Sequence, residues 1–226
     1  MELYEAMRTT FAAREFTGDP LPDDVLYRIL DNARFAPSGG NRQGARVLVI
    51  RAPETRHALA ELALPGARRY IAQLRAGENP WTSVVPCGVD PQTIAGTEVP
   101  RSMTQPLLDA AVVLVVCIDL RVVASTDMEL PRVGVVSGAS VYTLVWNILL
   151  AARNEGFGGT ITTVAIAEEP AIKALLGIPE HCAVCAVLPL GKPVRQLTRL
   201  KRLDVPAFTM LERWDGAPLA KPGSPD

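Results

Sequence analysis

The sequence predicts a single globular domain of mixed helices and strands, and three observations lead to this prediction. The chain has 226 residues, a length that suits one sizeable core. Hydrophobic residues make up 48% of it and charged residues 21%, as in ordinary soluble proteins. Apolar residues recur at helical spacing in some segments and form continuous runs typical of buried strands in others. We therefore expect one domain over residues 1–226.

The N-terminal half opens with helices and then alternates strand and helix. The expected elements are helices at 2–13 and 21–36, a strand at 45–53 and a short helix at 53–64. Asp23 stands where the cap of the second helix is expected, and Pro37 lies just beyond its end. Residues 76–106 contain five prolines, so we expect an irregular stretch that covers a neighbouring surface.

The C-terminal half centres on a continuous apolar run at 110–120, which is typical of a strand buried on both faces. The elements expected after it are a long helix at 137–154, a glycine-led strand at 156–166, a helix ending before Gly177 and a strand at 182–191. The long helix is apolar on one face and nearly as apolar on the other, where Tyr142, Trp146 and Leu150 lie. We expect its second apolar face to be covered by another copy of the chain, in a homodimer.

Charge and hydropathy argue against two classes of partner. A net charge of −1 gives no electrostatic reason to expect nucleic acid or an anionic membrane surface. Residues 133–152 are uncharged and long enough to span a bilayer, but serine, threonine, asparagine and glycine dilute them. We interpret this segment as a buried helix, and the N-terminus does not resemble a signal peptide.

The four cysteines are too few and too scattered for a disulfide framework, so we expect a reduced, cytoplasmic protein. Cys182 and Cys185 form a C-x-x-C pair just after His181, which raises the question of a metal. They lie in a predicted strand, where positions i and i+3 face opposite sides of the sheet. A single pair would also leave zinc two ligands short. We therefore expect buried thiols and no metal site.

The loop "APSGGNRQG" at 36–44 joins a predicted helix to a predicted strand. Phosphate-binding loops run in the opposite order, because the phosphate lies at the N-terminus of the following helix. The loop instead offers Ser38, Asn41 and Gln43 on a glycine-rich backbone that can approach a ligand closely. Carboxamides carry a donor and an acceptor side by side, which complements the edge of a flat heterocycle such as a flavin.

With its surroundings at 13–50, the Pro-Ser-x-x-Asn-x-Gln pattern resembles the N-terminal signature of the nitroreductase family of FMN-dependent oxidoreductases. Further matching segments follow in the family's order at 109–119, 154–163, 175–193 and 200–203. The resemblance covers nearly the whole chain apart from residues 64–106, which we expect to form a variable lid or substrate region. We expect residues 215–226 to be a loose tail.

The resemblance implies an α+β fold, with a mostly antiparallel central sheet flanked by helices and an obligate homodimer that binds FMN at its interface. Arg14 matches a basic residue that contacts the flavin. The implied contacts to the ribityl chain and the ring edge are Pro37, Ser38, Gly39, Asn41 and Gln43. The segment that passes the ring from its dimethylbenzene side to N5 is matched by Ile161, Thr162 and Thr163, and the phosphate clamp by Lys201 and Arg202.

The sequence departs from the family pattern at three places. Phe11 stands where the family usually has an arginine, and Arg8, one helical turn earlier, could reach the same phosphate instead. Gly44 and Ala45 replace a common tryptophan, and Lys192 stands where an aromatic residue is frequent. These differences affect the expected substrate more than the expected cofactor.

The implied activity is hydride transfer from NADH or NADPH through FMN to an electron-poor small molecule such as a nitroaromatic or a quinone. In such an enzyme the flavin carries the chemistry, so no catalytic acid or base is assigned. Two alternatives remain open: a protein that stores or senses FMN without turnover, and a specialised family member that fragments flavin or removes halogen from one physiological substrate.

Overall fold

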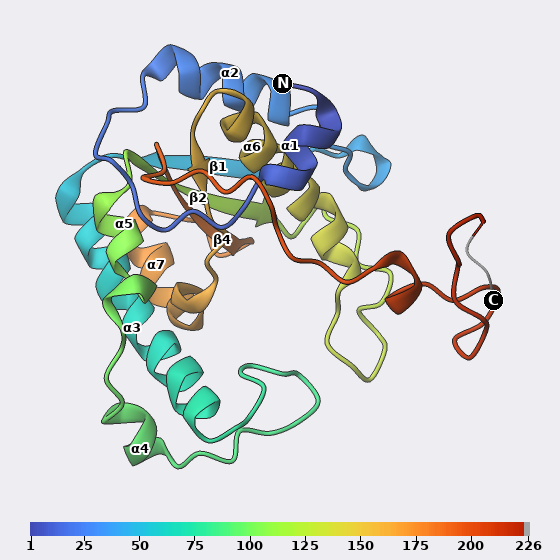
Figure 1. Ribbon diagram of the computed structural model, residues 1–226. Coiled ribbons are helices and arrows are strands. Elements are labelled where there is room, and N and C mark those ends of the chain that lie inside the picture. Colours follow the sequence, from blue (N-terminus) through green and yellow to red (C-terminus); the bar gives the residue numbers. More distant parts are fainter. Residues whose placement is uncertain (224–226) are drawn as a thin grey trace.

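The computed structural model, which describes residues 1–223, has a four-stranded antiparallel sheet between two groups of helices (Figure 1). The strands lie in the order β1-β2-β4-β3. Their bounds are β1 Ala45–Ile50, β2 Val112–Asp119, β3 Gly158–Gly159 and β4 Cys182–Gly191. The predicted α+β class with an antiparallel sheet is therefore confirmed, and the predicted strands at 45–53, 110–120 and 182–191 are all present.

The helices form one layer on each face of the sheet (Figure 1). One layer contains α1 (Leu3–Thr9), α2 (Asp23–Ala33) and α6 (Tyr142–Asn154), and the other contains α3 (Pro53–Arg75), α5 (Gln105–Asp109) and α7 (Glu169–Leu176). Strand β2 is buried along its whole length, because Leu114 and Val116 face one helical layer while Val113 and Val115 face the other. This burial on both faces explains its uninterrupted apolar sequence.

Short elements complete the chain. Helix α4 (Pro91–Ala95) lies in the segment after α3. Single 3₁₀ turns occur at η1 (Gly39–Asn41), η2 (Arg101–Met103), η3 (Val136–Ser140), η4 (Val164–Glu168) and η5 (Val205–Ala207). Two of these, η1 and η3, lie next to each other at the start of α6 and shape the candidate site described below.

Helix α2 begins differently from the prediction. Its N-cap is Pro22, and the expected capping role of Asp23 is wrong. The Asp23 carboxylate instead lies 2.6 Å from the Arg51 guanidinium, so it ties the start of α2 to the end of β1. The helix ends at Ala33, before Pro37, as predicted.

Three predicted boundaries are wrong because tertiary contacts interrupt local patterns. Helix α1 ends at Thr9 rather than at residue 13, since the chain then extends so that Ala12 pairs with Gly159. The helix predicted from residue 137 begins at Tyr142, after η3. The strand predicted at 156–166 keeps only Gly158–Gly159, beyond which a lone bridge joins Thr162 to Val187 before η4 begins.

Helix α3 is much longer than the predicted short helix at 53–64. It continues through Pro65, which lacks an amide donor, to Arg75. Packing against η4 stabilises this continuation, and Gly66 is the point of closest approach. A β-carbon on Gly66 would lie 2.1 Å from the carbonyl oxygen of Val164, so only glycine permits this contact. The start of the expected variable region, residues 64–75, is therefore helical.

Residues 133–152, which we interpret as a buried helix although they are long enough to span a bilayer, are divided between a loop, η3 and α6. In residues 1–223, no helix combines the length and the apolar character that a membrane crossing requires. The predicted loose tail falls partly outside the described residues, which end at Gly223.

We predict that Gly66→Ala destabilises the protein by about 1–3 kcal/mol, because the new methyl group forces α3 away from η4. Thermal unfolding followed by circular dichroism measures this loss. Gly96→Ala is the control, since its β-carbon would meet Gln92 at an ordinary contact distance of 3.5 Å. Equal melting temperatures for the two variants would contradict the proposed contact.

Candidate functional site

The loop at 36–44 is fixed to the beginning of α6 by two hydrogen bonds. The amide of Gly39 donates to the Ser140 hydroxyl oxygen at 3.0 Å, and the Thr143 hydroxyl donates to the Pro37 carbonyl at 3.0 Å. Inside the loop, the Gln43 amide donates to the Ser38 hydroxyl oxygen at 3.0 Å. The loop therefore has a defined conformation that α6 imposes on it.

Two predicted cofactor ligands in this loop adopt left-handed backbone conformations. Asn41 has φ of 53° and Gln43 has φ of 50°, a region that residues other than glycine seldom occupy. Both side chains are exposed, and their one mutual contact is a long hydrogen bond of 3.4 Å from the Gln43 amide group to the Asn41 carbonyl. Such strain concentrates at functional sites, and here it leaves both carboxamides available to a ligand.

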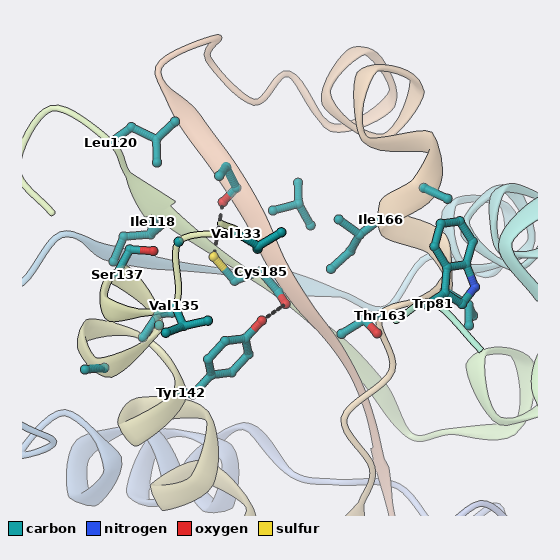
Figure 2. A pocket seen from close by; sticks show the side chains of 18 of the residues that line it. Trp81, Ile118, Leu120, Val133, Val135, Ser137, Tyr142, Thr163, Ile166 and Cys185 are labelled. Atoms are coloured by element: carbon teal, nitrogen blue, oxygen red, sulfur yellow. Dashed lines mark hydrogen bonds between the residues drawn. The ribbon is translucent and has the colours of Figure 1, made fainter. Parts of the chain in front are cut away.

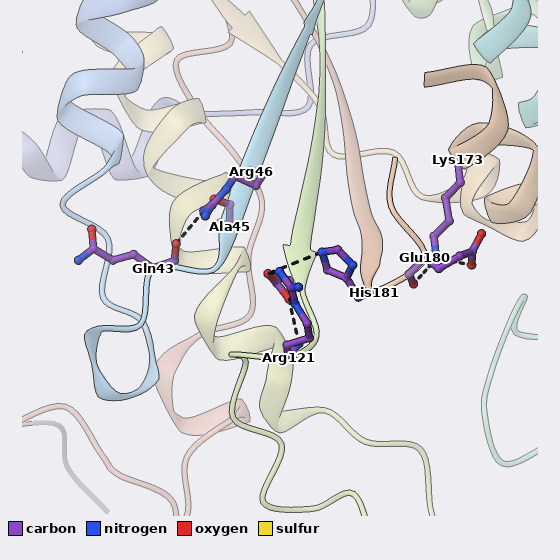
Figure 3. A network of polar contacts seen from close by, with 8 residues as sticks. Gln43, Ala45, Arg46, Arg121, Lys173, Glu180 and His181 are labelled. Atoms are coloured by element: carbon purple, nitrogen blue, oxygen red, sulfur yellow. Dashed lines mark hydrogen bonds and ion pairs between the residues drawn. The ribbon is translucent and has the colours of Figure 1, made fainter. Parts of the chain in front are cut away.

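Residues that the sequence did not single out fix the far end of this loop (Figure 3). Arg46 on β1 donates to the carbonyls of Gln43 at 3.0 Å and Ala45 at 2.8 Å. Nearby, the Asp119 carboxylate at the end of β2 accepts two hydrogen bonds from the Arg121 guanidinium, which lowers the pKa of Asp119 to about 2. His181 lies 4.0 Å from the same carboxylate. Of these residues, His181 stands out in the sequence beside the C-x-x-C pair, and no motif marks Arg46, Asp119 or Arg121.

Arg14 lies at the opposite end of α6. The amide of Ala13 donates to the Gly159 carbonyl at 2.9 Å, and Arg153 in the last turn of α6 donates to Thr9 at 3.1 Å. Since α6 has 13 residues, its two ends are separated by about 20 Å. The structure therefore does not bring Arg14 and the 36–44 loop together within one chain.

The segment with Ile161, Thr162 and Thr163 starts near Gly159 and runs beside β4 toward a large cavity. Thr162 exchanges two backbone hydrogen bonds with Val187, of 2.9 and 3.0 Å. Thr163 lines the cavity, and Ile161 is exposed. Of the eleven predicted cofactor residues, Thr163 is the one found among the residues that line this cavity.

Lys201 and Arg202 lie on the C-terminal tail. Residues 192–197 run beside the start of the chain, where the Val194 amide donates to Glu15 at 3.1 Å and the Gln196 side chain to Thr9 at 2.9 Å. Beyond them the tail leaves the body of the molecule (Figure 1), and the hydrogen bonds of the described tail residues after 197 stay within the tail. Within the described chain, neither Lys201 nor Arg202 makes an ion pair with a carboxylate.

The cavity has a volume of about 1360 Å³ and lies between α6, β4 and η4. In Figure 2, Trp81, Thr163 and Ile166 lie on one side of β4, and Tyr142 and Val135 lie on the other. None of the described residues that line it carries a charged side chain. An apolar cavity of this kind suits an apolar or aromatic ligand or a partner surface.

Cys185 lies in the wall of this cavity at a β-bulge. The pairing of β2 with β4 slips by one residue between Val116 and Cys117, which leaves Cys185 without a partner on β2. Its carbonyl accepts a hydrogen bond of 3.1 Å from the Tyr142 hydroxyl. Burial raises the pKa of the Cys185 thiol to about 11, so the thiol stays neutral. Cys182 belongs to the opposite core, which confirms that the C-x-x-C pair faces both sides of the sheet.

A buried carboxylate shapes the loop that forms another wall of the cavity. Asp127 is 3% exposed and accepts hydrogen bonds from the amide of Val135 at 2.7 Å, the amide of Val136 at 3.3 Å and the Arg132 guanidinium at 2.7 Å. The two amides and Arg132 lower the pKa of Asp127 to about 2. The charged carboxylate therefore folds residues 127–136 back against the start of α6.

We predict that Asp127→Asn lowers the free energy of unfolding at pH 7, because the amide replaces a charge that three donors stabilise. Since the folded pKa of about 2 lies below the usual value of 3.8, the difference between wild type and variant persists above pH 4 and shrinks as the pH falls toward 2. Urea unfolding between pH 7 and pH 3 measures this. Glu129→Gln, at an exposed position in the same loop, is the control; a difference that stays constant down to pH 3 would argue against a charged Asp127.

Several known proteins are similar to this chain in sequence or in fold. The model of the nitroreductase family matches residues 7–192. An NADH dehydrogenase of Thermus thermophilus is 30% identical over 183 residues, which are 81% of this chain and 82% of the relative. Iodotyrosine deiodinase 1 of Rattus norvegicus is 25% identical over 197 residues, which are 87% of this chain and 64% of the relative.

Solved structures share the fold at lower sequence identity. An oxidized iodotyrosine deiodinase bound to FMN and 3-iodo-L-tyrosine matches with a TM-score of 0.65 and 19% identity, covering 90% of this chain and 96% of its own. The NADPH:FMN oxidoreductase from Vibrio harveyi, complexed with NAD+, matches with a TM-score of 0.63 and 20% identity, covering 96% of this chain and 79% of its own. With a family model that spans most of its length and a relative at 30% identity, this chain belongs to the nitroreductase family.

Proposed function

We propose that the protein is an FMN-dependent oxidoreductase that takes hydride from NADH or NADPH and reduces an electron-poor small molecule, such as a nitroaromatic or a quinone. The observation that carries this proposal is the 36–44 loop. Its family pattern is present, its Asn41 and Gln43 are held in left-handed conformations, and their carboxamides face solvent with little to bind. Relatives described as NADH dehydrogenase and NADPH:FMN oxidoreductase support the same activity.

The basic residues of this chain fit the phosphate of FMN. Residues 192–203 contain five cations and no acid. Lys192 pairs with Asp19 at 2.9 Å, whereas Lys201 and Arg202 have no carboxylate partner in the described chain. Arg14 is likewise exposed, with one long contact of 3.4 Å to the carbonyl of Ala12. Unpaired guanidinium and ammonium groups of this kind are suited to a phosphate dianion.

We further infer that two copies of the chain form a homodimer and share each FMN site. The 36–44 loop and Arg14 are about 20 Å apart along α6, which is too far for compact enclosure of one flavin by one chain. A two-fold axis near α6 would bring the loop of one protomer next to Arg14 of its partner. The tail supports this assembly, because large apolar side chains are exposed on it: Leu203, Val205, Phe208, Met210, Leu211, Trp214 and Leu219.

Helix α6 adds a second exposed apolar surface. Tyr142 is 44% exposed and Trp146 is 39% exposed, while Val145 and Ile148 on the other face are fully buried. Helix α6 thus turns an apolar face away from its own core, and a dimer would give that face a partner. The cytoplasmic location stays a prediction from the scattered cysteines.

Bound FMN would supply the two-electron chemistry, with a hydride received from NAD(P)H and passed to an acceptor that also takes up a proton from solvent. The protein's own residues bind and orient. Asn41 and Gln43 present carboxamides to the ring edge, Lys201 and Arg202 hold the phosphate, and the apolar cavity excludes water from the acceptor. No side chain of the chain is assigned as an acid or a base.

A specialised reaction is the second candidate. The similarity to iodotyrosine deiodinases in sequence and fold supports it, although the chain spans 64% of the rat relative. A role in FMN storage or sensing would differ from both, since NADH or NADPH would then not reduce the bound flavin under anaerobic conditions.

We predict that the protein purifies with FMN rather than FAD. We also predict that Asn41→Ala weakens FMN binding about tenfold or more, because leaving a buried flavin group without its hydrogen-bond partner costs about 1–3 kcal/mol. Fluorescence titration of the apoprotein measures the affinity, and chromatography of the released cofactor identifies it. Arg202→Ala should weaken binding further, since it removes a charged contact to the phosphate.

The matched control is Asn79→Ala, at an exposed asparagine far from the loop in sequence. It should bind FMN with wild-type affinity. A wild-type protein that neither contains nor takes up FMN would overturn the proposed function, and an unchanged affinity in Asn41→Ala would remove the loop from the site.

A further inference from the structure

We propose that Arg46 is a positioning residue for the flavin, which holds the backbone of Gln43 so that the Gln43 carboxamide is presented to FMN. This proposal rests on the FMN-dependent function proposed above and adds to it a residue that no family motif marks. Three features carry it: the backbone conformation of the 36–44 loop, the hydrogen bonds of Arg46, and the ion pair beside Arg46.

Gln43 has a backbone conformation that residues other than glycine seldom adopt. Its φ of 50° lies in the left-handed region, as do those of Gly40 at 61° and Asn41 at 53°. A glutamine keeps this conformation only where surrounding contacts impose it. Its amide donates to the Ser38 hydroxyl oxygen at 3.0 Å, which holds the residue on its N-terminal side. The contact on its C-terminal side comes from Arg46.

Arg46 holds the carbonyls on both sides of Gly44. One terminal nitrogen of its guanidinium, Nη1, donates to the Gln43 carbonyl at 3.0 Å and to the Ala45 carbonyl at 2.8 Å. The Gly44 carbonyl between them accepts a hydrogen bond of 3.0 Å from the amide of Asp119 at the end of β2. Three successive carbonyls are thus bonded, so the peptide that follows Gln43 has a fixed orientation.

The ion pair beside Arg46 leaves its guanidinium available for these carbonyls. Arg46 and Asp119 both line a small cavity of about 280 Å³ on the α7 side of the sheet, where the Asp119 carboxylate could compete for Arg46. Arg121 occupies that carboxylate instead, since its amide and Nε each donate at 3.0 Å and its Nη2 donates at 2.7 Å. Within residues 1–223, Arg46 makes no ion pair of its own.

Arg46 acts on Gln43 through the backbone. In Figure 3, the Gln43 side chain points away from Arg46, and the contact between the two residues is made by the Gln43 carbonyl. Strand β1 pairs with β2 over Ala45–Ile50, and Ser140 and Thr143 hold the other end of the loop. Loss of Arg46 would therefore free the peptide after Gln43 while the strand stays paired, and FMN binding would then have to order Gln43.

A double-mutant cycle on FMN binding tests this coupling. Fluorescence titration of the apoprotein gives Kd for the wild type, Arg46→Met, Gln43→Ala and the double variant. We expect Arg46→Met to weaken binding about fivefold alone, but about twofold or less when residue 43 is already alanine, because no carboxamide is then left to position. Arg46→Lys keeps a cationic N–H donor near the two carbonyls and should retain most of the affinity.

The midpoint potential of bound FMN provides a second readout. A hydrogen bond at the ring edge stabilises oxidised and reduced flavin unequally, so Arg46→Met should shift the potential in the same direction as Gln43→Ala. The double variant should shift it no further than Gln43→Ala alone. The control is Arg51→Met just beyond the other end of β1, where the arginine donates to the Leu21 carbonyl at 3.1 Å. It should keep wild-type affinity and potential.

Three outcomes would overturn the role of Arg46. Additive losses in the cycle would mean that Arg46 acts on FMN independently of Gln43, as a direct ligand would. Wild-type affinity in a folded Arg46→Met protein would leave nothing for Arg46 to position. An equal loss in Arg51→Met would assign the effect to general destabilisation of β1. A wild-type protein that takes up no FMN would instead count against the proposed function itself.

Discussion

Helix α6 fixes the distance between the two parts of the candidate cofactor site. Its buried stripe, with Val145, Ile148 and Ala152, packs on the sheet and on α2 and cannot shift without opening the core. Its first residues hold the 36–44 loop, and its last turn holds the segment that contains Arg14. Because these contacts are at opposite ends of a rigid rod, the candidate cofactor residues of one chain form two separate groups.

Beside α6, one edge of β4 is paired with another strand over only part of its length. Strand β3 covers only Leu190 and Gly191 of β4, so the stretch around Cys185 has no full neighbouring strand on that side. At the bulge, Cys185 has no partner on β2 and its carbonyl accepts a hydrogen bond from the Tyr142 hydroxyl, and pairing with β2 resumes at Val184. The apolar cavity lies beside this stretch. The cavity therefore results from a short strand and a bulge, and the cluster around Asp127 keeps its outer wall in place.

The sequence predicted those elements whose formation depends on local pattern. The run at 110–120 became β2, and Gly177 ends α7 in a left-handed conformation, as its position suggested. The errors have tertiary causes. The helix predicted at 53–64 is too short, because contact with η4 carries α3 through Pro65 to Arg75. The glycines at 158 and 159 suggested the start of a long strand, but they serve close packing against Leu190 and Pro193.

At the candidate site, too, the sequence predicts only those features that depend on a local pattern. A motif identified the 36–44 loop, because its residues are close in sequence and their chemistry can be read from their types. The separation of that loop from Arg14 depends on how α6 lies between them, which no short pattern records. The sequence did not single out Trp81 in the cavity wall, because the segment around it matches no motif. Its left-handed backbone and the hydrogen bond from its amide to buried Gln73 become evident only in three dimensions.

The central claim is that each FMN site combines the loop of one protomer with the Arg14 region of its partner. Mixed dimers of Asn41→Ala and Arg14→Ala, isolated by two affinity tags, test it directly through FMN titration. In the shared arrangement, one site of the mixed dimer carries both substitutions and the other carries none. We predict one FMN per mixed dimer bound with wild-type affinity; two weakened sites, each with the affinity of one parent variant, would contradict the shared arrangement.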